Sequence, residues 1–329
     1  MPFPGFTYSV NFGSHSPIVS ENRRNYLLLH LTVFIWGWTA ILGKLITRHM
    51  SAFKLVWLRL PIALTGIIAY LLIRRISLKI SRRQALIYAL VAFDLTVHWI
   101  AFYLSIQVSN ASVTLACFAT GSLFTALIEP MFMKRKIEAY ELIFGAMVVG
   151  ALFLIFNVET KYTLGIILGI LAALTSSILA VMNGYLVQKG HDGMKMSFWE
   201  IAWACVMMSI FVLIYKPWTG DWFSMSGEDL FYLIVLSIAA TAVPFLISLH
   251  ILKTVSPYTV SLTLNLETVY GTLLALFLLH EDKDLTKWFY LGVGIIFSTV
   301  FLNGWIKLRK KAQVLDEKFV KGENINRDI

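Results

Sequence analysis

Residues 109–116 read SNASVTLA and open one apolar segment, and residues 256–263 read SPYTVSLT and open another. An interrupted apolar segment precedes each stretch, with Asp94 and His98 in the first copy and Pro244 in the second. A charged turn and a glycine-marked apolar segment follow each stretch. This order indicates an internal repeat. If each copy holds an odd number of spans, the two copies lie in opposite orientations, as in many secondary transporters with a midplane site.

The composition is that of a membrane protein. Of the 329 residues, 58% are hydrophobic and 14% are charged, whereas soluble domains average about 45–50% apolar and about 25% charged residues. The mean hydropathy is +0.72. The net charge of +9 fits basic loops on the cytoplasmic side, so no nucleic-acid partner is expected. Cys117 and Cys205 lie in apolar runs without metal-ligand spacing, so neither a metal nor a cofactor is expected.

A transmembrane helix needs about 20 mostly apolar residues. Ten segments meet this condition, namely 26–47, 52–73, 84–107, 109–133, 139–158, 163–188, 197–215, 229–252, 257–280 and 286–307. We therefore predict an all-α integral membrane protein with ten transmembrane helices in two inverted five-helix repeats. The repeats are residues 26–158 and 159–308, flanked by cytoplasmic tails at 1–25 and 309–329.

Basic residues in the loops predict the orientation. If both termini are cytoplasmic, the inner side holds most of them, including Arg74, Arg75, Lys79, Arg82, Arg83, Lys134, Arg135, Lys136, Lys189 and Lys195. The outer side holds fewer, which is the asymmetry expected of membrane proteins. The chain has no long loops or sorting signals, which favours a bacterial inner (plasma) membrane.

Four stretches in a fixed order carry a family resemblance. They are Trp36-Gly37-Trp38 with Lys44, Leu58-Arg59-Leu60, the hairpin from Ala101-Phe102-Tyr103 to Ser112, and Asn265 to Gly271 running on to His280-Glu281. Together they resemble the EamA type of the drug/metabolite transporter (DMT) superfamily over residues 26–308. The resemblance implies ten helices in two inverted repeats, a central cavity, and export or exchange of small metabolites, such as amino acids, without ATP.

Ionisable residues at membrane depth are candidates for the transport site, because such charges cost about 2.5–3.5 kcal/mol on insertion scales and usually face a cavity or a partner. Glu267 lies near the middle of the ninth span. We expect it to bind a substrate amine or to exchange a proton; the alternative is a buried acid hydrogen-bonded to a neighbouring helix. Asp94 and His98 share one helix face at spacing i, i+4. We expect that face to line the pathway, unless the pair only fixes helix packing.

Two basic residues lie deeper than the loops, toward the outer side. Lys44 and Arg59 either bind a substrate carboxylate, neutralise Asp94 or Glu267, or extend to the interface as long basic side chains commonly do. Arg59 is the deeper of the two and therefore the better candidate.

Further residues are assigned to the cavity wall, the inner gate and a hinge. Tyr270, one turn from Glu267, and Asn265 are expected to shape the cavity, whereas the aromatic side chains Trp36, Trp38, Trp99 and Trp203 are cavity residues or interface anchors. Asn183 is a weaker candidate for solute contact. Glu129, Glu200 and His250 lie near inner span ends and form a polar gate, or are simply solvated there. Pro244 removes a backbone hydrogen bond and permits a hinge.

The sequence therefore predicts a secondary transporter of a small metabolite such as an amino acid, working by alternating access, with the proton as a candidate coupling ion. It acts in the lipid bilayer as a monomer or homodimer. Multidrug efflux and uptake of a cofactor or precursor are alternatives on the same fold, and a membrane sensor or scaffold is an alternative of a different class. An enzyme is not expected, because the chain has no His-Glu-x-x-His and no phosphate-binding loop motif.

Overall fold

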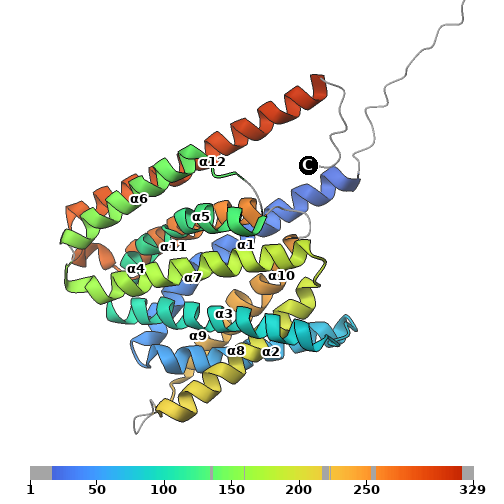
Figure 1. Cartoon of the computed structure of the whole chain (residues 1–329). Coiled ribbons are helices and arrows are strands. Elements are labelled where there is room, and N and C mark those ends of the chain that lie inside the picture. Colours follow the sequence, from blue (N-terminus) through green and yellow to red (C-terminus); the bar gives the residue numbers. More distant parts are fainter. Residues whose placement is uncertain are drawn as a thin grey trace, which may run out of the picture.

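Helices form every regular element of the computed structural model, which describes residues 17–133, 136–158, 160–216, 222, 224–252 and 257–320. The first half contains α1 (Pro17–Thr47), α2 (Ala52–Ile73), α3 (Arg82–Val108), α4 (Ala111–Phe118), α5 (Gly121–Met133) and α6 (Ala139–Val158). The second contains η1 (Thr160–Tyr162), α7 (Thr163–Gln188), α8 (Gly193–Tyr215), α9 (Gly227–Ser237), η2 (Ile238–Ala242), α10 (Val243–Ile251), α11 (Pro257–Leu278), η3 (Glu281–Asp284) and α12 (Lys287–Val320). Figure 1 shows their arrangement.

Polar caps determine where several helices begin. Ser81 and Gln84 form a reciprocal capping box at α3, in which Gln84 N donates to Ser81 Oγ (3.2 Å) and Ser81 N donates to Gln84 Oε1 (2.9 Å). Asn110 caps α4, because its Oδ1 accepts from Val113 N at 2.8 Å. Such caps satisfy backbone N–H groups that the first helical turn leaves unpaired. The apolar segments that follow can therefore enter the membrane as helices from their first turn.

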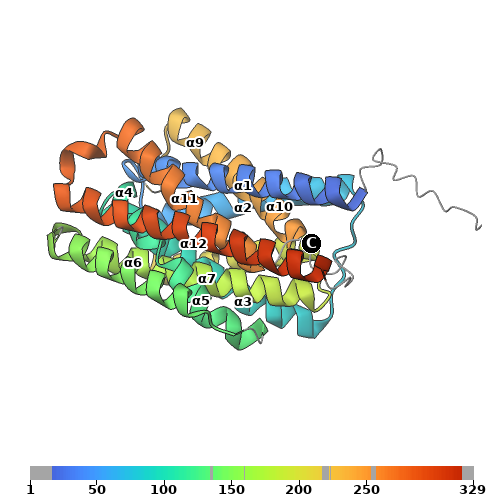
Figure 2. The same cartoon turned by 90° about the horizontal axis from the view of Figure 1, so that it is seen from above.

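Long apolar helices dominate the structure. Among the described residues, seven helical segments are long and apolar enough to cross a membrane: Arg24–Thr47, Ala52–Ile73, Arg82–Val108, Ala111–Met133, Thr163–Gln188, Gly193–Tyr215 and Gly227–Ile251. Shorter apolar helices cover Ala139–Ile155 and Leu266–Leu278. The all-helical membrane architecture agrees with the prediction, whereas the number of ten spans stays a prediction. Figure 2 shows the long helices running side by side in roughly one direction.

The outer surface of the bundle is apolar. Large hydrophobic side chains on several helices are exposed, among them Leu86, Leu90, Phe93, Phe153, Leu213, Phe231 and Phe277. Exposed apolar area on this scale is a liability in water and is suited to lipid. This surface identifies the protein as an integral membrane protein.

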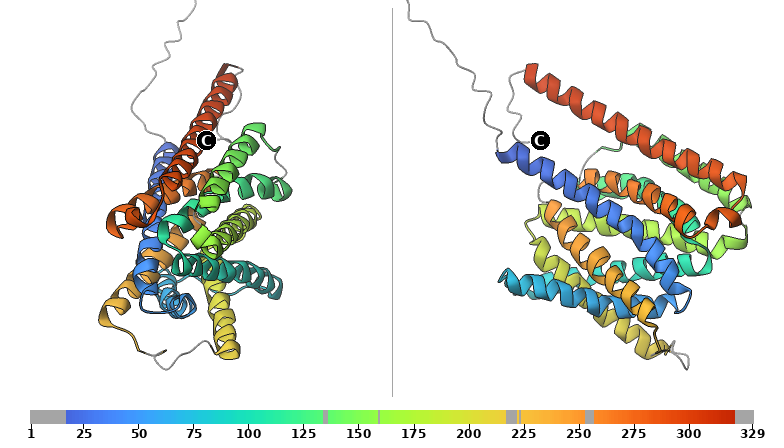
Figure 3. Two further views of the ribbon diagram at one scale, coloured as in Figure 1. Left: turned by 90° about the vertical axis from the view of Figure 1, so that its left-hand side faces the viewer. Right: turned by 180° about the vertical axis from the view of Figure 1, so that it is seen from behind.

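The two predicted halves are interleaved. From the first half, α1 packs along α11, α3 packs along α7 and α8, and α6 packs along α12, as can be followed in Figures 1 and 3. Each long helix of the centre therefore has a neighbour from the other half. The interior is consequently lined by both halves, and it is there that the candidate site lies.

Two helices are interrupted inside the bundle. The chain leaves α4 at Phe118 and enters α5 at Gly121, and the π-helical turn η2 separates α9 from α10 just before Pro244. Proline lacks the N–H that a continuous helix needs. In a membrane, irregular backbone is tolerated only where protein or a cavity surrounds it. Both interruptions lie beside the cavity described below, which Phe118, Ala240 and Thr241 help to line.

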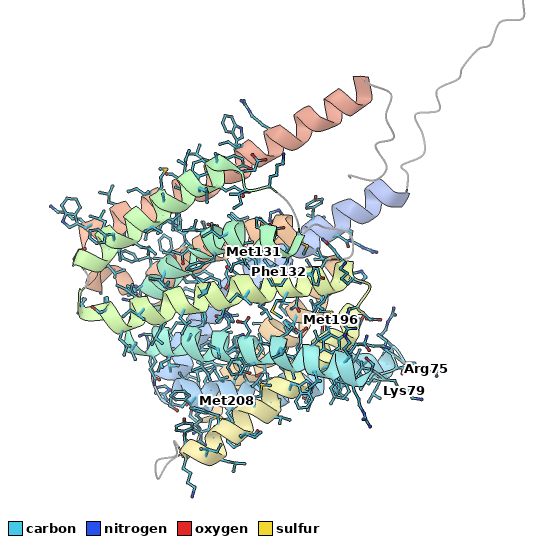
Figure 4. The ribbon with its side chains drawn as sticks, viewed as in Figure 1. Arg75, Lys79, Met131, Phe132, Met196 and Met208 are labelled. Carbon is cyan, nitrogen blue, oxygen red and sulfur yellow. The ribbon has the colours of Figure 1, made fainter. Side chains whose placement is uncertain are left out.

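One end of the bundle is marked by basic residues. The connection between α2 and α3, together with the first residues of α3, carries Arg74, Arg75, Lys79, Arg82 and Arg83. We call this the basic end. Figure 4 shows Arg75 and Lys79 at this end of the ribbon.

Candidate functional site

A cavity of about 120 Å³ lies in the interior, between α1, α2, α3, α4, α7, η2, α10 and α11. Aromatic rings form much of its wall, including those of Trp36, Trp99, Phe102, Phe118 and Phe245. A small number of polar side chains open into it. Mostly apolar walls with a few convergent polar groups are typical of sites for small molecules.

Arg59 on α2 is the cation of this cavity. Its side chain is 2% exposed. Nη1 donates to the hydroxyl of Tyr103 (2.6 Å) and Nη2 donates to Oγ1 of Thr241 (2.5 Å). The guanidinium carbon lies 4.4 Å from the centroid of the Trp99 ring, close enough for a cation–π interaction. Neutral hydrogen-bond acceptors and aromatic faces therefore hold this charge inside the bundle.

The charge of Arg59 is not neutralised by the protein residues that the structure describes. Among these residues no carboxylate forms an ion pair with it, and its Nε has no hydrogen-bond partner. Burying a charge without a counter-ion is costly. Since guanidinium groups bind carboxylates through two parallel hydrogen bonds, the arrangement favours an anionic group in the cavity.

Glu267 on α11 brings a carboxyl group to the same cavity. It is 7% exposed, and the described residues offer it neither a hydrogen bond nor an ion pair. It does not pair with Arg59, although both groups act electrostatically on Tyr103. The cavity thus has a basic and an acidic group at separate positions on its wall.

The predicted pair of Asp94 and His98 is divided between two environments. His98 lines the cavity, and its Nδ1 lies 2.9 Å from the carbonyl oxygen of Ala172. A carbonyl only accepts, so Nδ1 carries a proton and Nε2 is the atom left to face a ligand. Asp94 does not line the cavity, and its Oδ2 is buried without a partner among the described residues. A shared relay between the two side chains stays a prediction.

Comparison with known proteins identifies the family. The sequence model of the EamA-like transporter family matches residues 23–157 and matches again over residues 163–305. The chain belongs to the EamA-like transporter family. The two matches follow the two halves of this EamA-like protein in order, and they make it a membrane transporter of the drug/metabolite type.

A solved structure shares the fold of this EamA-like transporter. It is a crystal structure described only as that of a protein, with a TM-score of 0.64 and 12% sequence identity, covering 87% of this chain and 98% of that one. At this identity the likeness shows the fold alone. No curated protein matches the sequence.

Two predicted residues of the transporter serve contacts between helices. Lys44 donates from Nζ to the carbonyl oxygens of Ile106 (3.1 Å) and Ser109 (2.8 Å) at the end of α3, where a cation complements the free carbonyls. The ring of Tyr270 meets that of Phe34 edge-on at 5.6 Å, between α11 and α1. Neither Lys44 nor Tyr270 lines the cavity.

The predicted gate residues lie outside the cavity wall. Glu129 is buried on α5, Glu200 is buried on α8, and His250 lies near the end of α10, so a common gate stays a prediction. Asn265 belongs to α11, but its side chain falls outside the described residues. No group of three His, Cys, Asp or Glu side chains in the described part of the chain is arranged to hold a metal ion.

The sequence analysis did not identify the hydrogen-bond partners of Arg59, which are Tyr103 and Thr241. Tyr103 lies 44 positions from Arg59 in the sequence, and Thr241 lies 182 positions away. A buried arginine requires hydrogen-bond acceptors, so the depth of Arg59 in its span indicates that such acceptors exist. An isolated Tyr or Thr in an apolar helix carries no mark that distinguishes it from an ordinary packing residue, so the sequence does not locate them.

Replacing Gly43 by alanine should disturb the support of Arg59. A Cβ at Gly43 would lie 2.5 Å from Cε1 and 2.7 Å from Cδ1 of the buried Tyr103 ring. We expect the free energy of unfolding to fall by about 1–3 kcal/mol, the usual range for overpacking. Thermal unfolding in detergent, followed by tryptophan fluorescence, measures this. Gly150→Ala is the control, because a Cβ there meets nothing within 4 Å; equal stability of the two variants would contradict the prediction.

Proposed function

We propose that this protein is a secondary transporter that carries a small metabolite with a carboxylate group, such as an amino acid, through the central cavity by alternating access. It spans a bacterial inner membrane ten times, as two inverted five-helix repeats with both termini in the cytoplasm. It exports or exchanges the solute without ATP. The observation that carries the proposal is Arg59, a buried guanidinium on the cavity wall without a carboxylate partner among the described residues.

The substrate carboxylate supplies the missing counter-ion. Tyr103 and Thr241 fix the orientation of the guanidinium, so that little conformational freedom is lost when the solute binds. An arginine recognises a carboxylate by shape as well as charge, because its donors form a planar fork. These properties support Arg59 as the carboxylate-binding residue.

Glu267 provides the complementary contact. Its carboxyl group faces the cavity apart from Arg59, which suits the ammonium group of a zwitterionic solute. The aromatic walls, formed in part by Trp99 and Phe102, accommodate the apolar part of the solute. Transport of uncharged amphipathic solutes through the same cavity is the alternative function, multidrug efflux.

The two helix interruptions are the proposed moving parts. The break between α4 and α5 and the π-helical turn before Pro244 belong to opposite halves and both adjoin the cavity. Interrupted helices beside a midplane site are a recurrent feature of transporters in which one repeat rocks against the other. Pro244 is accordingly proposed as the hinge on the second half.

Counterflow into proteoliposomes tests the proposal. Vesicles with purified protein are preloaded with an unlabelled amino-acid pool and supplied with labelled members of that pool outside. We expect saturable accumulation that free amino acids inhibit and that their methyl esters, which lack the carboxylate charge, do not inhibit. Inhibition by esters and acids alike would contradict carboxylate recognition.

Variants of acidic residues connect counterflow to the cavity. Glu267→Gln is expected to reduce it, whereas Glu228→Gln, at an exposed acid on α9, is the matched control and should not. Loss in both variants would show that the assay reports protein damage. Absence of counterflow with every metabolite pool would favour the sensor or scaffold alternative.

A further inference from the structure

A second buried carboxyl group lies behind the cavity wall. Glu200 on α8 is 0% exposed and does not line the cavity. Glu200 is connected to the cavity through Asn183 on α7, whose side chain lines the cavity. Asn183 Nδ2 donates to Glu200 Oε2 over 3.3 Å, which is a long hydrogen bond.

Both side chains keep an unsatisfied oxygen. Oε1 of Glu200 and Oδ1 of Asn183 have no hydrogen-bond partner among the described residues, and Asn183 is 4% exposed. A buried acceptor without a donor loses its hydrogen bonds to water and gains none in the protein, which costs free energy. An ionised carboxylate at this depth would also need a cation, and none of the described residues forms an ion pair with Glu200. One added proton on Glu200 removes the charge and supplies a donor.

A further polar side chain lies on a helix that packs against α8. It is that of Tyr88, which is buried on α3. The Tyr88 hydroxyl lies 2.9 Å from Nδ1 of His191. His191 is partly exposed in the turn between α7 and α8, so this contact reaches the end of the bundle.

That end is the basic end. Met196, one turn before Glu200 on α8, lies in Figure 4 toward the side of the molecule that shows Arg75 and Lys79. Met208, farther along α8, lies away from it. Glu200, four residues after Met196 and eight before Met208, therefore belongs to the part of α8 that is nearer the basic end.

The helices packed against α8 are α2, α3 and α10, and α7 reaches Glu200 through Asn183. The titratable or charged side chains on these four helices are those of Lys54, Arg59, Tyr70, Arg82, Arg83, Tyr88, Asp94, His98, Tyr103, Tyr185 and His250. At the start of α8 are Asp192, its N-cap, and Lys195, whose Nζ donates to the carbonyl oxygen of Lys79. Lys195 is thus directed to the loop.

We infer that Glu200 is a proton-binding site, hydrogen-bonded to Asn183 on the wall of the solute cavity, and that it couples proton movement to transport. Glu200 takes up one proton from the solution on one side of the membrane and releases one on the other; no other group is consumed. The coupling rests on the proposed transport function, whereas the protonation of Glu200 does not.

Infrared spectroscopy of the purified protein in a detergent that contains no ester group tests the protonation without any solute. An exposed glutamate is ionised at neutral pH, so the carbonyl stretching band of a protonated carboxylic acid at that pH reports buried acids. We expect Glu200→Gln to remove one component of this band, Asn183→Ala to shift it through the lost hydrogen bond, and Glu228→Gln to leave it unchanged. An unaltered band in Glu200→Gln would overturn the inference.

Transport assays test the coupling separately. With a labelled amino acid that shows counterflow, accumulation driven by a pH gradient is compared with counterflow in the same vesicles. We expect Glu200→Gln to lower the ratio of gradient-driven accumulation to counterflow by roughly tenfold, within the range of typical coupling between sites. An unchanged ratio would overturn the coupling. Absence of wild-type counterflow would instead count against the proposed function, and the infrared result would stand apart from it.

Discussion

Replacement of Arg59 by glutamine is expected to lower the counterflow of a carboxylate solute by about a hundredfold, because hydrogen bonds to charged groups contribute about 1.5–3 kcal/mol and the only cation on the described cavity wall is lost. Glutamine removes the buried charge and keeps a polar amide, so the fold should be retained. The measurement is the initial rate of counterflow across a range of solute concentrations.

Two further variants define what Arg59 contributes. Arg59→Lys keeps the positive charge but replaces the planar fork by a single ammonium group, so an intermediate rate is expected. Arg48→Gln removes an exposed arginine beyond the end of α1 and serves as the matched control. Wild-type rates in Arg59→Gln, or an equal loss in Arg48→Gln, would contradict the assignment of the carboxylate site to Arg59.

Replacement of Glu281 by alanine is expected to be the most destabilising of the changes considered, by about 2–6 kcal/mol, since each of two buried N–H groups left unpaired costs about 1–3 kcal/mol. The Glu281 carboxylate accepts from Ala111 N (2.9 Å) and Ser112 N (2.8 Å). Both N–H groups belong to the first turn of α4, where a negative charge also complements the helix dipole. This carboxylate in the second half therefore holds a helix of the first half.

Denaturant unfolding in detergent, followed by tryptophan fluorescence, measures the effect. Glu281→Gln keeps an acceptor for one of the two N–H groups and should lose about half as much stability as the alanine variant. Glu228→Ala removes an exposed glutamate from the first turn of α9 and is the control. If Glu281→Ala unfolds at the same denaturant concentration as Glu228→Ala, the carboxylate does not support α4.

The sequence predicted the helical architecture better than its irregularities. Apolar length places the helices, because the bilayer requires about 20 residues for each span. The predicted span 109–133 corresponds to the apolar helical segment Ala111–Met133, but the sequence did not predict the break between α4 and α5 near Thr120. Gly and Thr are too common in membrane helices to indicate a break. Pro244 signalled a defect, but the π-helical turn lies before the proline, at Ile238–Ala242.

The depth of charged residues predicted Arg59 and Glu267 as candidates, and the structure places both on the cavity wall. The i, i+4 spacing of Asp94 and His98 indicated a shared face but not the width of the cavity, which reaches His98 alone. The contact of Asn183 with Glu200 depends on how α7 and α8 pack after their turn. Such contacts are set by tertiary packing and have no periodic signature in the sequence.

The π-helical turn η2 fixes the phase of the helix that follows it. A π turn holds one residue more than an α turn, and one residue corresponds to a rotation of about 100° because 3.6 residues complete a turn. Phe245, Ser248 and Leu249 on α10 face the cavity in the register that this extra residue provides. The count of residues in the turn, rather than their types, therefore determines which side chains of α10 face the cavity. A relative without the extra residue presents a different row of side chains, so cavity residues beyond η2 correspond only after a shift of one position.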